Sequence, residues 1–408
     1  MMTASINNNM PRVDRRSCLL AGDAPEHRPQ RREPCNGWWN TLRNALLFAF
    51  ASTCLFGYKG VLAQADNGAT LSLDGMQAIV AKASEHASRW DGPTSGPPGR
   101  VGMTVAVICE DLRNGGVLGV ARGVGEASTL MGWHSRIFDA HGSPTGRKHA
   151  IAAALDMRPD GVILIGSDAE SLESRLSAFA RHHIPIVGWH VGPTAGRLSS
   201  GSVAINVSTD PLEVARVTAM AAIVESHGTA GVVIFTDSNF TIAMRKANAM
   251  AELIGKCKGC TLLEIRQVPI SQSARQMPGV TRKLLEKYGA RWTHALAIND
   301  IYFDYATPEF TRMGRDIHLF SAGDGSPAAF MRIQANTFQD GTVAEPLNLQ
   351  GWQLVDELNR LLSGEAVSGY IVPVHLVTRK NIGFDGGPQM KFDPDNGYRD
   401  AYRQIWKR

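Results

Sequence analysis

The feature that most constrains this chain is a set of short apolar runs, each followed at once by a small polar cluster. The five clusters are Ser167-Asp168, Trp189-His190, 236–239, Asn299-Asp300 and 323–325. Runs this short and this apolar are typical of strands buried on both faces, which occur in parallel sheets covered by helices. In such sheets, ligands bind outside the carboxyl ends of the strands. The sequence therefore predicts hydrogen-bonding side chains directed into one cleft.

The spacing of the runs predicts two series of alternating strands and helices. The first series has strands at 105–108, 136–138, 162–165, 186–188 and 203–205. The second begins with a helix over 211–227 and continues with strands at 231–236, 261–266, 295–299 and 317–321. Alternation at this spacing indicates repeated βαβ units with right-handed crossovers. We expect an α/β fold of two Rossmann-like lobes, each with a parallel sheet.

The last part of the chain has too few elements for a lobe of its own. It offers a short apolar run at 342–344, a helix over 349–362 and another apolar run at 370–374. We expect these pieces to return and complete the two sheets, so that each lobe is discontinuous in sequence. The predicted domains are a first lobe of 100–206 plus 324–344, and a second lobe of 207–323 plus 345–380.

Two segments flank the predicted lobes. Residues 66–99 indicate an added helix followed by a linker rich in Gly and Pro, which break regular structure. Residues 381–408 form a C-terminal extension. Tyr398, Tyr402 and Trp406 have near-helical spacing in it, which predicts that this extension packs on a lobe surface.

Residues 1–65 resemble a targeting segment rather than a folded domain. A long stretch rich in Arg, Pro and Asn precedes an apolar stretch from Ala45 to about Phe56, and Ala63-Gln64-Ala65 has small residues where a signal peptidase needs them. We expect a secretory signal peptide with a long n-region, cleaved near Ala65, and export to the periplasm. The alternative is an uncleaved anchor, although the apolar stretch is short for a membrane span.

The distribution of charge argues against nucleic-acid binding. Residues 1–65 contain eight Lys or Arg and four Asp or Glu, which is the whole net charge of +4, and the rest of the chain has 34 residues of each sign. Proteins that bind nucleic acids concentrate positive charge in order to displace counterions from phosphates. The predicted mature chain has no such excess.

Three cysteines follow the predicted leader: Cys109, Cys257 and Cys260. A C-x-x-C pair in an exported protein favours a small-loop disulfide between Cys257 and Cys260. A redox-active pair is the alternative. A zinc site would need about four ligands and there is no second pair, so we expect no metal. Cys109, on the first predicted strand, is interpreted as a small buried apolar residue.

The order of these motifs resembles the periplasmic sugar-binding proteins of the ribose-binding type, the type I solute receptors of ABC importers. The resemblance covers about residues 100–380. Asp111-Leu112-Arg113-Asn114 is similar to the family's first ligand loop, Asn299-Asp300 to its Asn-Asp after a second-lobe strand, and 323–325 to its Asp-Gly loop. Residues 342–346 are similar to a hinge segment. The resemblance implies two lobes, a three-segment hinge and a ligand held between the lobes.

Carried over residue by residue, the resemblance implies a set of ligand contacts. These are Asn114, Asp168, Asn299, Asp324 and Glu345, and Asp300 is included in the predicted site as the second residue of the Asn-Asp motif. The chain also departs from the family pattern in three places. Lys246 stands where the family has Arg, Trp189-His190 replaces an Asp-Arg pair, and Gly116-Val117 replaces a pair of Phe residues. We include Trp189, His190 and Lys246 in the predicted site.

These residue types suit a polyol, whose hydroxyls both donate and accept hydrogen bonds. Carboxylates accept strongly, Asn does both, Lys donates, and an aromatic ring such as Trp189 covers the apolar face of a sugar. Each residue also has a structural alternative. Asp168 could cap a helix, Asn299-Asp300 could form a turn, Trp189 could belong to the core, Lys246 could be a solvated helix charge, and Glu345 could tie the hinge.

The sequence contains no Gly-x-Ser-x-Gly, no Walker loop and no Gly-x-Gly-x-x-Gly after the first strand. We therefore expect no cofactor and no enzymatic activity. The predicted function is a monomeric periplasmic receptor that captures a small sugar or polyol and delivers it to an inner-membrane ABC permease. Two alternatives remain open: a sensor that presents the solute to a membrane chemoreceptor or kinase, and a secreted carbohydrate-active enzyme.

Overall fold

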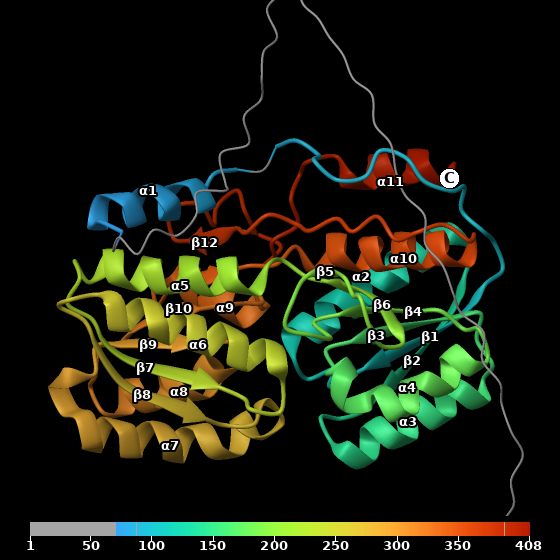
Figure 1. The fold of residues 1–408 in the computed structure, drawn as a ribbon. Helices are drawn as coiled ribbons and strands as arrows, with labels where there is room; N and C mark the ends of the chain where they lie inside the picture. The colour runs from blue at the N-terminus through green and yellow to red at the C-terminus, as the bar shows by residue number, and fades with distance from the viewer. Residues whose placement is uncertain (1–70, 87, 387) are drawn as a thin grey trace, which may run out of the picture. The chain divides into compact units, whose positions relative to one another are not determined.

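The computed structural model describes residues 71–86, 88–386 and 388–408, which contain two six-stranded sheets. The strand orders are β2-β1-β3-β4-β6-β5 and β12-β11-β10-β9-β7-β8. All neighbouring strands run parallel except the pairs β5–β6 and β11–β12, which are antiparallel. The fold is thus the predicted α/β arrangement of two Rossmann-like lobes (Figure 1). The predicted leader, 1–65, lies outside the described residues.

The first lobe is built on the sheet of β1 to β6. Its strands are β1 (Thr104–Cys109), β2 (His134–Asp139), β3 (Gly161–Ile165), β4 (Ile186–Trp189), β5 (Gly196–Arg197) and β6 (Val203–Val207). Its helices are α2 (Gly115–Met131), α3 (Pro144–Asp156), α4 (Ala169–Arg181), α10 (Leu347–Leu362) and α11 (Tyr398–Trp406). Alternate residues of β1 enter different core clusters: Val105 and Val107 on one face, Ala106 and Ile108 on the other. A strand buried in this way explains the uninterrupted apolar runs in the sequence.

The second lobe is built on the sheet of β7 to β12. Its strands are β7 (Gly231–Thr236), β8 (Thr261–Gln267), β9 (His294–Ala297), β10 (His318–Ser321), β11 (Gln339–Val343) and β12 (Leu376–Thr378). Its helices are α1 (Leu73–Ala83), α5 (Pro211–Glu225), α6 (Thr241–Lys256), α7 (Ser273–Tyr288), α8 (Ile301–Arg312) and α9 (Pro327–Ala335), with short 3₁₀ turns at Ile270–Gln272 and Gly289–Arg291. No helix in the described part of the chain is both long and apolar enough to span a membrane.

The predicted domain boundaries are wrong for the last third of the chain. Residues 324–344 do not join the first lobe, because β11 pairs with β10 in the second sheet. A right-handed crossover through α9 keeps these two strands adjacent. Residues 345–380 belong mainly to the first lobe, because α10 packs closely on α2, where a Cβ at Gly351 would lie 2.6 Å from the backbone of Gly123. The apolar run at 370–374 does not form a strand, and the strand that completes the second sheet is β12, a few residues later.

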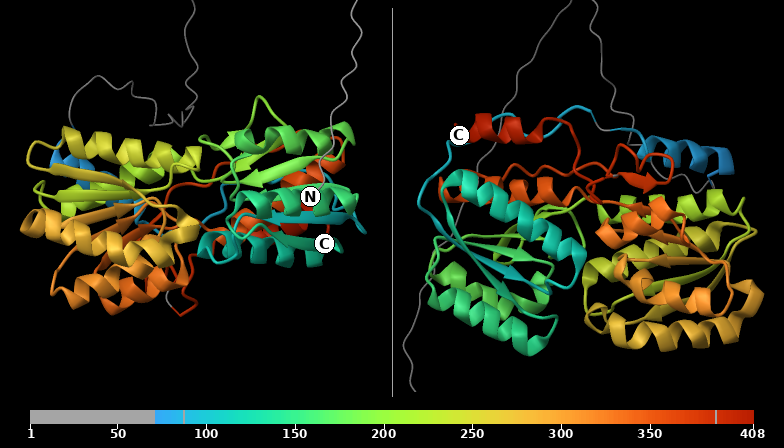
Figure 2. Two further views of the ribbon diagram at one scale, coloured as in Figure 1. Left: turned by 90° about the horizontal axis from the view of Figure 1, so that it is seen from below. Right: turned by 180° about the vertical axis from the view of Figure 1, so that it is seen from behind.

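Within the described residues the chain passes between the lobes five times. Three passages match the predicted hinge: β6 to α5, β11 to α10, and α10 to β12. The other two come from the terminal segments, α1 to β1 and β12 to α11. Met76 of α1 is part of the second lobe's core cluster, whereas Tyr398, Tyr402 and Trp406 of α11 are buried in the first lobe's, as predicted. Figure 2 shows both helices on the same side as the hinge passages.

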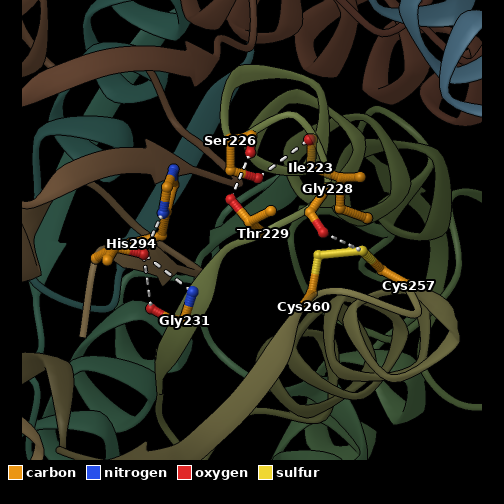
Figure 3. Close-up of a disulfide and its surroundings, with 9 residues drawn as sticks. Ile223, Ser226, Gly228, Thr229, Gly231, Cys257, Cys260 and His294 are labelled. Atoms are coloured by element: carbon orange, nitrogen blue, oxygen red, sulfur yellow. Dashed lines mark hydrogen bonds between the residues drawn. A yellow bond between two sulfur atoms is a disulfide. The ribbon is translucent and has the colours of Figure 1, made fainter. Parts of the chain in front are cut away.

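The structure joins Cys257 and Cys260 in a disulfide with a Cα–Cα distance of 5.3 Å (Figure 3). It spans the turn from α6 to β8, and the Sγ atom of Cys257 lies 3.5 Å from the carbonyl oxygen of Gly228. Cys109 is a free and buried thiol on β1. Burial, with a smaller effect from Asp139, raises the pKa of this thiol to about 12, which makes it an inert core side chain.

Candidate ligand site

A cavity of about 260 Å³ lies between the two lobes. Much of its polar wall comes from the carboxyl ends of the strands, as the sequence predicts for parallel sheets, and the helices that follow them supply the rest. The first lobe contributes Glu110, Asp111, Asn114, Arg147, Trp189 and His190. The second lobe contributes Asp237, Asn239, Lys246, Gln272, Asn299 and Asp324 together with the ring of Phe240. The cavity thus exists only while both lobes face each other.

At the floor of the cavity, the lining side chains of His190 and Lys246 meet the buried carboxylate of Glu345 beneath them. Nε2 of His190 lies 2.8 Å from Oε1 of Glu345, and the Lys246 ammonium lies 3.8 Å from the same oxygen. Oε2 of Glu345 accepts hydrogen bonds from the Gln350 amide and the Thr209 backbone N–H. Burial acts to raise the pKa of Glu345, but the charges and hydrogen bonds of these neighbours outweigh it and lower the pKa to about 2. Glu345 is therefore a fixed anion beneath the cavity.

Asp324 is a different kind of carboxylate, because it faces the cavity. Its Oδ2 accepts a hydrogen bond of 2.7 Å from the Asn299 amide, and its side chain is 4 % exposed. Burial raises its pKa to about 6, with the charges of His190 and Lys246 opposing the shift. Such a group can accept a hydrogen bond from a ligand hydroxyl near neutral pH.

A glycine explains one departure from the family pattern. A Cβ at Gly116 would lie 2.1 Å from Oδ2 of Asp324, so any side chain at this position would collide with that carboxylate. The N–H of Gly116 is bonded to Oδ1 of Asn114, which caps α2. The small residue thus lets the first turn of α2, in the first lobe, approach Asp324 of the second.

The acids that the first lobe places at the cavity are paired with cations. Glu110 forms an ion pair with Arg147 and accepts a hydrogen bond of 2.6 Å from Ser167. Burial raises the pKa of Glu110, although both partners oppose the shift. The Arg113 guanidinium binds both oxygens of Asp111. These pairs hold the side chains in one geometry, which leaves their remaining lone pairs and N–H groups for a ligand.

Trp189 and His190 form a stacked pair, with ring centroids 3.7 Å apart and planes within 9°. The indole N–H of Trp189 donates to Oε1 of Gln350 at 2.7 Å. One face of the indole is therefore covered by the imidazole, and the ring is fixed at the cavity wall. Phe240 offers a second aromatic surface from the opposite lobe.

Six of the nine predicted ligand residues line the cavity: Asn114, Trp189, His190, Lys246, Asn299 and Asp324. The other three, Asp168, Asp300 and Glu345, do not. Asp300 is fully buried, where its Oδ2 accepts the N–H groups of Gly325 and Ser326 and its Oδ1 accepts the Gln339 amide. It shapes the loop that presents Asp324, and Glu345 lies one layer behind His190.

Asp168 also lies outside the cavity lining, and both of its carboxylate oxygens accept hydrogen bonds from other parts of the protein. Its Oδ1 accepts the N–H of Ser171 at 3.0 Å, which makes it the N-cap of α4. Its Oδ2 accepts hydrogen bonds from Thr241 of the other lobe. The capping alternative left open by the sequence is thus correct for one of the two oxygens.

Sequence reasoning missed several cavity residues. Asp237 and Asn239 belong to a strand-end cluster recognised in the sequence, but they were not included among the predicted contacts. Arg147 follows β2 in the first turn of α3, and its position at a strand end was the available signal. Gln272 and Phe240 had no distinguishing pattern, because their place at the cavity depends on how the lobes meet.

His190, Asp324 and Glu345 have ligand atoms that all lie within 4.8 Å of one another, the kind of grouping that can hold a metal ion. The chemistry of the surroundings does not favour a cation there. The Lys246 ammonium and Nε2 of His190 both lie beside Oε1 of Glu345, and Oε2 already accepts hydrogen bonds from Gln350 and Thr209. The group is better described as an ion cluster that is neutralised within the protein.

Comparison with known families assigns the chain. Residues 105–366 match the family described as a periplasmic binding protein domain. The chain belongs to this family. No curated protein matches it in sequence.

Solved structures share the fold at low sequence identity. An ABC sugar transporter subunit from Rhodobacter sphaeroides is 18 % identical with a TM-score of 0.60, over 69 % of this chain and 99 % of that one. An ABC transporter solute-binding protein from Agrobacterium vitis with bound allitol is 18 % identical with a TM-score of 0.60, over 69 % and 97 %. One from Bacillus halodurans with bound myo-inositol is 16 % identical with a TM-score of 0.59, over 72 % and 98 %.

Proposed function

We propose that this periplasmic binding protein captures a small sugar or polyol between its lobes and delivers it to an ABC permease. The observation that carries the proposal is the cavity between the lobes, to which both lobes contribute polar side chains. Its volume of about 260 Å³ is slightly below the usual range of ligand pockets, roughly 300–1,000 Å³. A single sugar ring or a short polyol fits this size better than an oligosaccharide.

The chemistry of the walls suits hydroxyl groups. Asp324 and Asp237 accept hydrogen bonds, Lys246 and Arg147 donate them, and Asn299 can do both. A buried polar group left without a partner costs about 1–3 kcal/mol, so a guest with many hydroxyls is favoured over an apolar one. Trp189 and Phe240 supply the aromatic surface that a sugar ring needs on its C–H face.

Ligand binding would act through hinge closure. A ligand that touches both lobes binds the closed form better than the open form and shifts the equilibrium toward it. The passages between the lobes, including the one that carries Glu345 beneath the cavity, would act as the axis about which the lobes separate. The permease would then recognise the closed, loaded form.

The same proposal includes the setting in which the protein works. The leader would be cleaved near Ala65 and the mature protein would be a monomer in the periplasm. It would release its ligand unchanged, because a receptor that feeds a permease has no need for catalysis. Size-exclusion chromatography with light scattering tests whether the protein is a monomer. Chemical analysis of the recovered ligand tests whether it is released unchanged.

The direct test is a thermal-shift screen of monosaccharides, linear polyols and inositols, followed by calorimetric titration of the positive compounds. We expect at least one of them to bind with a stoichiometry of one per chain and to raise the melting temperature. Lack of binding by every sugar and polyol in the screen, together with binding of a solute without hydroxyl groups, would contradict the proposal.

A further inference from the structure

Helix α6 of the second lobe lacks an N-terminal cap from its own segment. Its N-cap residue, Phe240, provides no side-chain hydrogen bond. The first N–H groups of a helix have no partner within the helix, so an uncapped N-terminus needs one from elsewhere. In this structure the partner comes from the opposite lobe.

The partner is the Asp168 carboxylate of the first lobe. Its Oδ2 accepts hydrogen bonds from the backbone N–H of Thr241 at 3.1 Å and from the Thr241 hydroxyl at 2.6 Å. Its Oδ1 caps α4, so one carboxylate serves the N-termini of two helices in two lobes. The positive ends of both helix dipoles favour this charge, and at 7 % exposure it is largely shielded from water.

We propose that the contact between Asp168 and Thr241 is an interlobe clasp that determines how readily the protein closes. The clasp can form only when the lobes meet, because each partner belongs to a different lobe. Opening leaves α4 capped but removes the cap from α6. This inference rests on the proposed hinge closure and adds a positioning residue that need not touch the ligand.

The clasp is also connected to the cavity through α6. The first turns of this helix carry Ala243 and Lys246, and both line the cavity. Capping the helix therefore fixes the wall from which the Lys246 ammonium reaches the site. Closure and the ordering of this wall are expected to occur together.

The test measures closure without any ligand. A Cβ at Gly115 of the first lobe would lie 3.0 Å from the Cβ of Ser326 of the second lobe, slightly below the usual Cβ–Cβ separation of a disulfide. In a Gly115→Cys/Ser326→Cys protein, the rate of disulfide formation under a mild oxidant reports the population of the closed form. All variants carry this pair, so its own effect on the structure cancels in the comparison.

Asp168→Asn is the informative substitution. Asn caps helices well, so α4 keeps its bond to Oδ1, but the new amide nitrogen meets the N–H of Thr241, and both are donors. We expect cross-linking to slow by about tenfold, which corresponds to ~1.4 kcal/mol. Asp160→Asn is the matched control, because the Asp160 carboxylate accepts the backbone N–H of Thr104 at 2.7 Å within the first lobe, outside the hinge passages. It should leave the rate unchanged.

A double-mutant cycle with Thr241→Val separates the clasp from a general loss of structure. Thr241→Val removes the hydroxyl donor but keeps the backbone N–H, so we expect about fivefold slower cross-linking on its own. Added to Asp168→Asn, it should have almost no further effect. Additive effects, about fiftyfold in total, or an unchanged rate in Asp168→Asn would overturn the clasp. Because no sugar is present, this result is independent of whether the proposed ligand class is right.

Discussion

The two lobes contact each other on two sides, and the contacts differ in kind. On the cleft side, the lobes meet through polar side chains around a cavity, including the bonds between Asp168 and Thr241. On the hinge side, five chain passages run between them, and the terminal segments that make two of these passages pack on the first lobe largely through aromatic side chains. Polar contacts of this kind can exchange for water when the lobes separate, whereas buried aromatic contacts cannot do so at low cost.

The hinge-side contacts involve both terminal segments. Trp90 packs against Tyr370 and Tyr402, with ring centroids 5.2 and 5.4 Å away. The Arg360 guanidinium of α10 binds the carbonyl oxygen of Ser95 in the N-terminal segment and the carboxylate of Asp356. These contacts attach the N-terminal segment and α11 to the first lobe, while α1 remains attached to the second.

A second cluster ties the two terminal segments to each other on the second lobe. The Asp385 carboxylate lies 3.0 Å from Nδ1 of His86 and 2.8 Å from Nε2 of His375. Burial acts to raise the pKa of Asp385, but its two His partners outweigh this and lower the pKa. These contacts indicate that the lobes separate on the cleft side while the hinge side stays closed. Substitutions on the two sides should therefore affect different measurements.

Trp406→Ala should give the largest effect, and it should fall on stability alone. Trp406 is 1 % exposed, stacks on Trp352 at 5.4 Å and donates its indole N–H to Asp356. Removing a buried Trp costs about 3–5 kcal/mol, which urea unfolding would measure. Polyol affinity in the fraction that remains folded should change by less than about twofold. A large loss of affinity without a loss of stability would contradict the separation of the two sides.

Asp324→Ala should have the opposite profile. Loss of a charged acceptor in the cavity should weaken polyol binding about 100-fold, or ~3 kcal/mol. The ligand-induced rise in melting temperature should disappear, while the melting temperature of the free protein should stay nearly the same. Asp340→Ala, a half-buried carboxylate on β11 that bonds to His318 away from the cavity, is the control for loss of a charge. An unchanged ligand shift in Asp324→Ala would remove Asp324 from the site.

The Cys257→Ser/Cys260→Ser protein changes neither the cleft side nor the hinge side, so it is a reference for both. Closing so short a loop stabilises the protein by about 2 kcal/mol in the chain-entropy view. We expect a loss of stability of that order in chemical unfolding, with unchanged polyol affinity and an unchanged closure rate. In the unaltered exported protein, neither cysteine should react with a thiol reagent before reduction. Labelling without reduction would contradict the disulfide.

The pH dependence should distinguish two buried carboxylates: Asp324, which faces the cavity, and Glu345, which lies beneath it. With its pKa raised to about 6, Asp324 loses its charge as the pH falls, so polyol affinity should fall roughly tenfold from pH 7 to pH 5. Asp324→Asn should have a flatter profile in the same titration. Affinity that is constant over this range in the unaltered protein would argue against an ionised Asp324 as acceptor.

Asp324 and Glu345 change the free energy of unfolding in opposite directions as the pH changes. The raised pKa of Asp324 means that the folded state binds its proton more tightly, so this contribution is present below about pH 4 and is lost as the pH rises through 6. The lowered pKa of Glu345 contributes stability above about pH 4.5, which is lost as the pH falls toward 2. Unfolding of the Asp324→Asn protein between pH 4 and pH 7 isolates the first contribution.

The sequence predicted the parts that depend on local pattern. Buried parallel strands produce short apolar runs, and polar residues at their carboxyl ends indicated the cleft, which placed Asn299 and Asp324 at the cavity wall. The helical spacing of Tyr398, Tyr402 and Trp406 likewise predicted α11 and its buried face. In each case the sequence pattern and the strand or helix that it predicts lie within the same short segment.

The parts that failed depend on contacts between distant segments. The partner of Asp168, Thr241, lies 73 residues away in the other lobe, so the sequence could suggest a cap but not a clasp. The segments around Glu345 pass from one lobe to the other within a few residues, and no local pattern says which lobe follows. For the same reason the sequence missed the two extra passages made by the terminal segments.

The most direct measurement of the central claim is small-angle X-ray scattering of the mature protein with and without a saturating polyol that binds by calorimetry. If the lobes close over a hydroxyl-rich guest about a permanent hinge side, the radius of gyration must decrease when the polyol is added. The Asp324→Ala protein at the same polyol concentration must keep the larger value. A bound polyol that leaves the radius of gyration of the unaltered protein the same as in its absence would contradict the account.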